Sequence, residues 1–122
     1  MKKNVILSIK PEFVAEIKAG RKCFEFRKTI FRQKVKKVYI YASSPVSKVV
    51  GEFQPVDILV GAPVDIWEKT KSQSGITKAF YDEYFNGKPV AYAIVIQNLK
   101  IYDIPKELPF HAPQSFRYID SL

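Results

Sequence analysis

The sequence predicts an α+β fold in which a mixed β-barrel of about five to seven strands carries short peripheral helices. Stretches rich in β-branched and aromatic residues recur between turn signals, whereas only three short stretches have helical spacing. A closed or half-closed barrel buries such strands and removes exposed sheet edges. The chain has 122 residues, 47% of them hydrophobic, so residues 1–122 are expected to form a single domain around one core.

The N-terminal part is expected to begin with a strand over residues 4–9 and one helix over residues 10–20. Pro11 suits the first turn of a helix, where its missing N–H costs nothing, and Gly20 is typical of the position just beyond a helix end. The next expected strand covers residues 23–28. Because a strand has a period of two, its residues divide between two faces, with Phe24 and Phe26 on one and Cys23, Glu25 and Arg27 on the other.

Two more strands are expected over residues 36–43 and 48–60. Gly51 indicates a bulge or a close approach of another backbone, because glycine has no side chain to obstruct it. Pro55 cannot donate a ladder hydrogen bond, so the second stretch is expected to bend there between two strands.

The middle of the chain is expected to hold two short helices, over residues 62–73 and 75–88. Ser74 or Thr77 would cap the second helix. Residues 89–104 are expected to return to strand, and the proline-rich tail after them to be ordered coil that ends in a helical turn. The apolar stripe of the second helix would consist of Ile76, Phe80, Tyr84 and Phe85.

The charge distribution indicates an anionic partner. The net charge is +8, and residues 1–50 contain 13 lysines and arginines against 3 acidic residues, whereas residues 51–122 contain 7 against 9. A basic half on a small domain most often serves nucleic acid, and a merely solubilising surface is the alternative.

Several classes of protein are not expected. The single cysteine, Cys23, excludes an internal disulfide and fits a cytoplasmic location. No apolar run approaches the roughly 18 residues of a membrane helix. His111 is the one histidine and has no His/Cys cluster around it, so no metal site is predicted, and no phosphate-binding glycine motif indicates a cofactor.

Lys22, Glu25 and Arg27 are the strongest candidates for a functional site. Glu25 and Arg27 lie on one face of the expected strand, about 7 Å apart, and Lys22 lies just before that strand. Three roles remain open for them: a structural set of ion pairs, recognition of a polar ligand, or proton transfer by Lys22 or Glu25.

The spacing Gly20-x-Lys22-x-x-Glu25-x-Arg27 matches the pattern G-x-K-x-x-E-x-R of the ASCH domains, within the PUA-like superfamily. The stretches ILSIKPEFVAEIKAGRKCFEFRK and YIYASSPVSKVVGEF resemble the same family, and AYAIVIQNLKIYDIP and PQSFRYI resemble its branch of predicted transcriptional regulators. The resemblance covers the whole chain. It implies a PUA-like barrel, a cleft beside the barrel that the motif lines, and binding of RNA or another nucleic acid.

Some PUA-like relatives are enzymes, among them a small ASCH amidohydrolase that deacetylates acetylated cytidine, and a ribonuclease. The resemblance to the amidohydrolase extends to Lys22 and Arg27. Glu25 stands where that enzyme has a catalytic threonine, and Ser74, with Glu68 not far away, stands near the place of its glutamate. Two of the four roles therefore differ, and a different hydrolysis would use Glu25 as its base.

Three residues outside the motif are further candidates. Ser43 and Ser44 lie in a turn that would either present hydroxyl and N–H groups to a phosphate or only close a hairpin. Trp67 would border the cleft and stack on an unpaired base, although aromatic residues of a small barrel are usually core.

The sequence thus predicts a module that binds RNA or single-stranded nucleic acid, recognises a modified or flipped-out base, and has a regulatory role. Glu25 would accept from a base N–H, and Lys22 and Arg27 would contact phosphate or base oxygen. The basic segment 28–37, including Lys28 and Arg32, would attract the backbone. The alternative is a hydrolase of a modified nucleoside or a ribonuclease, with Lys22 and Glu25 as its catalytic pair.

Overall fold

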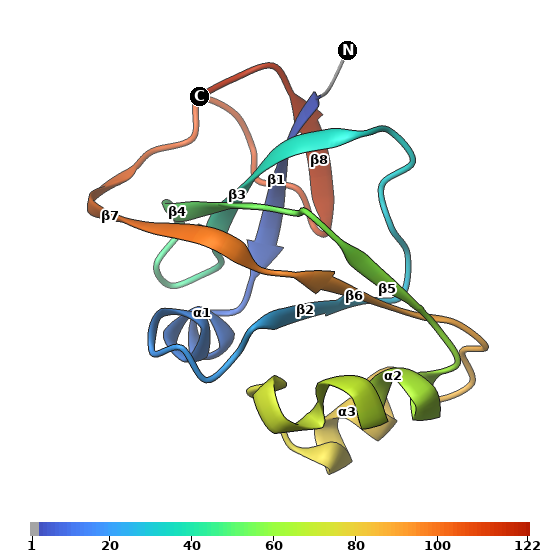
Figure 1. Cartoon of the computed structure of the whole chain (residues 1–122). Helices are drawn as coiled ribbons and strands as arrows, with labels where there is room; N and C mark the ends of the chain where they lie inside the picture. The colour runs from blue at the N-terminus through green and yellow to red at the C-terminus, as the bar shows by residue number, and fades with distance from the viewer. Residues whose placement is uncertain (1–2) are drawn as a thin grey trace.

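The computed structural model describes residues 3–122, which form two β-sheets, three α-helices and one 3-10 helix (Figure 1). In chain order the elements are β1 (Lys3–Ile9), α1 (Pro11–Lys18), β2 (Phe24–Arg27), β3 (Val35–Ala42), β4 (Lys48–Gln54), β5 (Ile58–Gly61), α2 (Pro63–Thr70), η1 (Lys71–Gln73), α3 (Lys78–Tyr84), β6 (Ala91–Val95), β7 (Gln97–Lys106) and β8 (Phe116–Ile119).

The two sheets share strands that run from one into the other. The five-stranded sheet has the order β7-β4-β3-β1-β8, and the three-stranded sheet has the order β2-β6-β5. β4 leads into β5 and β6 into β7, so the two sheets together form an open, barrel-like arrangement (Figure 1). The predicted α+β architecture is confirmed. Within residues 3–122 the sheets do not close fully, which corresponds to the half-closed form of the expected barrel, and there are eight strands instead of five to seven.

Two of the five predicted strand stretches are each divided, which gives seven strands, and the eighth is β8 in the tail. The stretch 48–60 breaks at residues 55–57, where Pro55 has no N–H for a ladder, as expected. The stretch 89–104 breaks at Ile96, which lies between β6 and β7. The predicted effect of Gly51 is also confirmed, because the β3–β4 register shifts beside it and a Cβ there would lie 2.6 Å from the carbonyl oxygen of Lys100.

The main core joins the two sheets. It includes Leu7 and Ile40 from the parallel pair β1–β3, Phe53 from β4, Ile94 from β6 and Ile17 from α1. The other face of the five-stranded sheet is also covered, because Ile6, Tyr39 and Val49 pack against Tyr102 and the tail residues Leu108 and Phe110. Burial on both faces explains why the central strands are continuously apolar in sequence.

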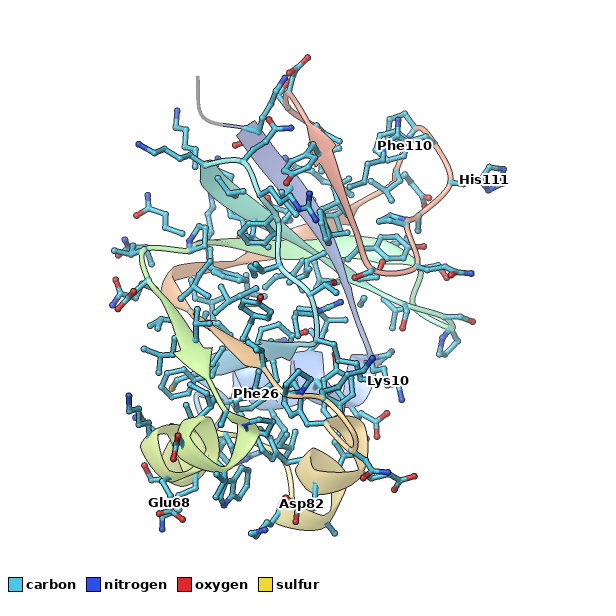
Figure 2. All side chains as sticks on the ribbon, turned by 90° about the vertical axis from the view of Figure 1, so that its right-hand side faces the viewer. Lys10, Phe26, Glu68, Asp82, Phe110 and His111 are labelled. Carbon is cyan, nitrogen blue, oxygen red and sulfur yellow. The ribbon has the colours of Figure 1, made fainter. Side chains whose placement is uncertain are left out.

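The helices α2 and α3 cover the three-stranded sheet at the end of the molecule remote from β8 (Figure 1). Their core is formed by Phe26, Ile66, Tyr81 and Phe85, and Phe26 points from β2 toward these helices (Figure 2). The predicted cap is confirmed for Thr77, whose Oγ1 accepts a hydrogen bond from the backbone N–H three residues later. Among residues 3–122, no helix combines the length and the apolar character needed to cross a bilayer.

The prediction for the apolar stripe of α3 was partly wrong. Phe85 is buried as expected, but its buried partner one turn earlier is Tyr81, while Phe80 is 37% exposed. The helix carries two aromatic pairs at i, i+4, namely 80/84 and 81/85, on adjacent faces. Spacing alone does not decide which of two such pairs meets the core.

The prediction for the tail was wrong as well. The expected helical turn is instead the strand β8, which pairs antiparallel with β1 between Asn4–Ile119 and Leu7–Phe116. A strand of four residues is too short to show a period of two, and its pairing partner lies at the other end of the sequence. The structure therefore uses the tail to cover one edge of β1.

We expect Tyr81→Phe to lower the free energy of unfolding by about 1 kcal/mol at neutral pH, because the hydroxyl of Tyr81 donates a 2.7 Å hydrogen bond to the carbonyl of Pro63. Burial raises the pKa of Tyr81 to about 12, whereas an unfolded tyrosine ionises near 10. The stabilisation from Tyr81 is thus complete below pH 10 and is lost as the pH rises toward 12.

Urea denaturation of the wild type and of Tyr81→Phe between pH 7 and pH 11 measures the difference in their free energies of unfolding. The contributions of the other titrating groups cancel in that difference. The gap between the two proteins should narrow as the pH rises above 10. A gap that stays constant across that range would contradict the assignment.

Candidate functional site

The motif residues meet in a pocket of about 450 Å³, which we call the motif pocket. Its walls come from the end of β1, the start of α1, β2, the turn after β3, α3 and the segment before β8. A hollow of this size is within the ordinary range of ligand sites. Five predicted site residues line it: Lys22, Glu25, Arg27, Lys28 and Ser43.

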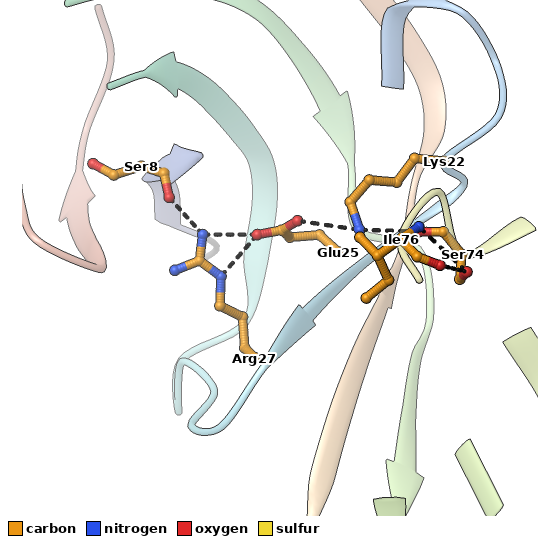
Figure 3. Close-up of polar contacts among 6 residues, drawn as sticks. All are labelled: Ser8, Lys22, Glu25, Arg27, Ser74 and Ile76. Carbon is orange, nitrogen blue, oxygen red and sulfur yellow. Dashed lines mark hydrogen bonds and ion pairs between the residues drawn. The ribbon is translucent and has the colours of Figure 1, made fainter. Parts of the chain in front are cut away.

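The floor of the pocket is a chain of paired charges (Figure 3). The carboxylate Oε2 of Glu25 accepts from Arg27, at 3.0 Å from Nε and 2.8 Å from Nη2. The other oxygen, Oε1, lies 3.8 Å from the ammonium Nζ of Lys22. Dashed lines in Figure 3 follow this chain from Ser8 on one side to Ser74 on the other. The predicted placement of Glu25 and Arg27 on one strand face is confirmed.

Lys22 is the most deeply buried of the three, with 2% of its side chain exposed. Its ammonium donates to the carbonyl oxygen of Ser74 at 3.2 Å and lies 4.7 Å from the ring centre of Phe26 and 5.5 Å from that of Phe13. Burial lowers the pKa of Lys22, although the charge of Glu25 acts in the opposite direction. The neutral amine form of Lys22 is therefore populated more readily than that of an exposed lysine.

Arg27 presents its outer edge to the pocket. Its side chain is 13% exposed, more than that of either partner. Nη2 also donates to the backbone carbonyl of Ser8 at 2.6 Å, and Nη1 donates to the hydroxyl of Ser115 at 3.3 Å. The guanidinium thus ties β2 to β1 and to the segment before β8, and only its long contact with Ser115 involves a pocket hydroxyl.

The link between η1 and α3 encloses Lys22. Lys22 and Ser74 form an isolated β-bridge, and the N–H of Cys23 donates to the carbonyl of Gln73 at 2.9 Å. Gly75 follows with a φ of +66°, and a Cβ on it would overlap the side chain of Lys22. This link therefore contacts the ammonium group of Lys22 through its backbone and contributes no carboxylate of its own.

The two residues near the place of the amidohydrolase's glutamate, Ser74 and Glu68, have different surroundings. Ser74 is buried, and its hydroxyl is bonded locally to the carbonyls of Lys71 and Ile76. Glu68 is exposed on the outer side of α2, where its carboxylate pairs with Lys71 at 2.7 Å (Figure 2). Neither side chain supplies a free carboxylate to the motif pocket.

Three other predicted site residues lie outside the motif pocket. Trp67 packs in the core under α2 and α3, with its ring centre 4.8 Å from that of Tyr81. Arg32 is exposed, and its backbone N–H donates to the hydroxyl of Tyr118. Ser44 belongs to the same turn as Ser43 but does not line the pocket. His111 projects from the tail loop at the opposite end of the molecule (Figure 2).

Sequence reasoning missed the pocket residues that come from other parts of the chain. Two signals were available in the sequence. One is the aromatic pair at i, i+4 in α3, and the other is the set of polar residues next to strand ends, namely Lys10 after β1 and Gln114 and Ser115 before β8. Neither shows which elements meet, because the fold brings them together from positions about 100 residues apart. The missed residues are Ser8, Ile9, Lys10, Phe13, Phe26, Ile76, Phe80, Tyr84, Gln114 and Ser115.

A larger groove of about 750 Å³ lies between residues 31–36 and 54–58. It contains Lys34 and Lys36 from the basic segment but none of the motif residues. Its size alone does not make it the better candidate, because the buried charges and the lowered pKa of Lys22 belong to the motif pocket. Among residues 3–122, no group of three or more histidine, cysteine or acidic residues is placed to hold a metal ion.

We expect Gly75→Ala to destabilise the protein clearly more than Gly87→Ala. Both glycines have a positive φ, +66° and +75°, so both substitutions incur a backbone cost of about 1 kcal/mol. A Cβ at position 87 meets nothing within 4 Å, whereas one at position 75 would lie 2.9 Å from the Cα of Lys22. Overpacking of this kind adds about 1–3 kcal/mol. Equal denaturation midpoints for the two variants would show that the link does not pack on Lys22.

Comparison with known proteins identifies the family to which this fold belongs. The model of the ASCH domain family matches residues 7–100. The crystal structure of ASCH from Zymomonas mobilis superposes with a TM-score of 0.87 and 27% sequence identity, over 96% of this chain and 87% of that chain. The expected PUA-like fold is thus confirmed.

Two curated relatives show how the domain occurs elsewhere. The ASCH domain-containing ribonuclease of Zymomonas mobilis is 29% identical over 99 residues, which are 80% of this chain and 66% of that protein. The large ribosomal subunit protein uL22 of Ureaplasma parvum is 40% identical over 98 residues, which are 77% of this chain and 32% of that protein. The chain spans only about a third of the ribosomal protein's length. The family match covers most of the chain, and the protein therefore belongs to the ASCH domain family.

Proposed function

We propose that this protein binds RNA or another single-stranded nucleic acid, and that the motif pocket holds one unpaired base, including a modified or flipped-out one. The observation that carries the proposal is the charged chain Lys22–Glu25–Arg27 on the floor of an open pocket. A pocket that offers both a carboxylate and a guanidinium suits a planar ligand that has N–H donors and carbonyl or phosphate acceptors.

The geometry of Glu25 leaves it able to accept from a ligand. Oε2 is occupied by Arg27, but Oε1 is 3.8 Å from Lys22, an ion-pair distance that is too long for a hydrogen bond. Oε1 therefore keeps acceptor capacity for an amino or imino group of a base. Arg27 can donate through Nη1, whose contact with Ser115 is long at 3.3 Å, to a base oxygen or a phosphate.

Charge outside the pocket supports a polyanionic partner. Lys28 lies at the pocket wall, and the basic segment 28–37 continues from it toward the second groove with Lys34 and Lys36. Such lysines contribute backbone attraction that is independent of sequence and falls with salt. A relative named as a ribonuclease is consistent with an RNA partner. A regulatory role, as in the branch of predicted transcriptional regulators, would act through this binding.

We expect Arg27→Gln to weaken binding of a short labelled single-stranded RNA at least about tenfold, because a charge-assisted donor at the pocket floor is lost. The matched control is Arg21→Gln, since Arg21 is also paired with a glutamate, Glu16, but its side chain is 67% exposed and lies outside the pocket. Fluorescence anisotropy at 50 and 200 mM salt measures both variants and the salt dependence of the wild type. A wild type that binds neither RNA nor nucleosides at low salt would exclude this function.

The second candidate is an enzyme, either a hydrolase of a modified nucleoside or a ribonuclease, in which Lys22 and Glu25 are the catalytic pair. The lowered pKa of Lys22 favours it, because a neutral amine can accept a proton from water or from a ribose 2′-hydroxyl. The carboxylate of Glu25 would then stabilise the ammonium that forms. Both oxygens of Glu25 face cations, so we assign the proton transfer to Lys22 rather than to Glu25.

We expect Lys22→Met to abolish turnover of RNA or of a modified nucleoside while the protein still folds, since the apolar side chain fits a buried site and Glu25 keeps Arg27. In the wild type the rate should rise with pH toward the lowered pKa of Lys22, because the base acts only when deprotonated. Turnover is measured by chromatography as product release from a digest of modified RNA. Lys69→Met on α2 is the surface control. Equal turnover in both variants would exclude Lys22 as the base.

A further inference from the structure

The wall that α3 contributes to the motif pocket is aromatic, and Phe80 in it lies beside the face of the helix that is buried in the core. Phe80 and Tyr84 line the pocket from one face of α3, with ring centres 6.3 Å apart and planes inclined by 10°. The main core contacts of the helix are made by the adjacent pair, Tyr81 and Phe85, which are almost fully buried, while Tyr84 is partly buried against the same cluster. Phe80 remains 37% exposed at the edge of a charged pocket, an unusual position for a phenylalanine.

Two lysines from other elements lie on these rings. The ammonium of Lys10, just before α1, is 5.7 Å from the ring centre of Phe80, and that of Lys28, just after β2, is 4.5 Å from the ring centre of Tyr84. Both lysines are exposed, and within residues 3–122 neither has a carboxylate partner within 4.0 Å. Each ring is thus paired with a cation whose charge is not neutralised by the protein.

Aromatic faces that alternate with free lysines are the two components of a site for single-stranded nucleic acid. Bases stack on the rings whatever their identity, and the ammonium groups meet the phosphates between them. A paired base offers no free face to such a wall, so the arrangement excludes a duplex. The two rings are nearly parallel, and each one contacts a different lysine, so together they offer two stacking positions.

We infer that Phe80 and Lys10 form a second nucleotide subsite, in which the base next to the one in the motif pocket stacks on Phe80 and its phosphate is bound by Lys10 and Lys28. Tyr84, which also lines the motif pocket, stacks on the base held there. This inference rests on the proposed function and narrows its ligand: the preferred partner is a strand of at least two unpaired nucleotides, not a free nucleoside.

The decisive variant is Phe80→Leu, which keeps an apolar side chain on α3 but removes the aromatic face. Its matched control is Phe110→Leu, because Phe110 also carries a cation, Arg117 at 3.9 Å from its ring centre, but lies at the far end of the molecule from Lys10 (Figure 2). The probes are the four ribonucleoside 5′-monophosphates and a 2′-O-methylated tetranucleotide, which cannot be cleaved through its 2′-oxygens.

We expect Phe80→Leu to weaken tetranucleotide binding about tenfold and to leave binding of the monophosphates unchanged. Phe80→Tyr should restore the affinity for the tetranucleotide, and Phe110→Leu should behave as wild type. Lys10→Gln should reduce the slope of log affinity against log salt by about 0.7, the value for one phosphate of a single strand. Thermal melting of each variant establishes that it is folded.

Three results would overturn the inference. Equal tetranucleotide affinity for Phe80→Leu and Phe110→Leu would exclude the subsite, while monophosphate binding by the wild type would leave the proposed function intact. An equal loss for monophosphates and tetranucleotide would place Phe80 in the first subsite only. A wild type that binds neither probe would overturn the proposed function, and the subsite with it.

Discussion

A carboxylate held between two cations inside the protein is the constraint on which the rest of the structure depends. Taking three charged groups out of water costs several kcal/mol for each ion, and this cost is offset only where every partner is correctly placed. Arg27 therefore needs the Ser8 carbonyl at the end of β1, and Lys22 needs the Ser74 carbonyl before α3. The link before α3, the strand β1 and the segment before β8 all contact β2 or the residues next to it through these charges.

The elements that sequence reasoning predicted correctly are those whose signals are local. Pro11 and Gly20 delimit α1, Pro55 divides β4 from β5, and Gly51 marks a close backbone approach, each through a property of one residue. β8 was missed because its pairing with β1 joins the two ends of the chain, and four residues carry no period. The open barrel likewise depends on where strands pair, which no single stretch reveals.

For the candidate site too, local signals predicted one part and long-range contacts determined the rest. The period of a strand was enough to place Glu25 and Arg27 side by side, but not to show that the face they share would be enclosed. Trp67 was a reasonable candidate for the pocket by residue type, yet it packs from α2 against Tyr81, while Phe80 of α3 reaches the pocket. On α3, a rotation by one residue decides whether Phe80 or Tyr81 meets the core. The packing of Tyr81 against Phe26 determines that rotation.

The antiparallel pairing of β1 with β8 affects how the domain can be joined to other protein segments. Asn4 lies opposite Ile119 at one end of this pair, where the amide of Asn4 also bonds the carbonyl of Asp120. Ser8 and Ser115, which border the motif pocket, lie at the other end. Polypeptide attached at either terminus thus leaves from the side remote from the pocket. Joining this domain to a larger protein would thus leave the motif pocket unobstructed, and a similar sequence does occur within a longer ribosomal protein.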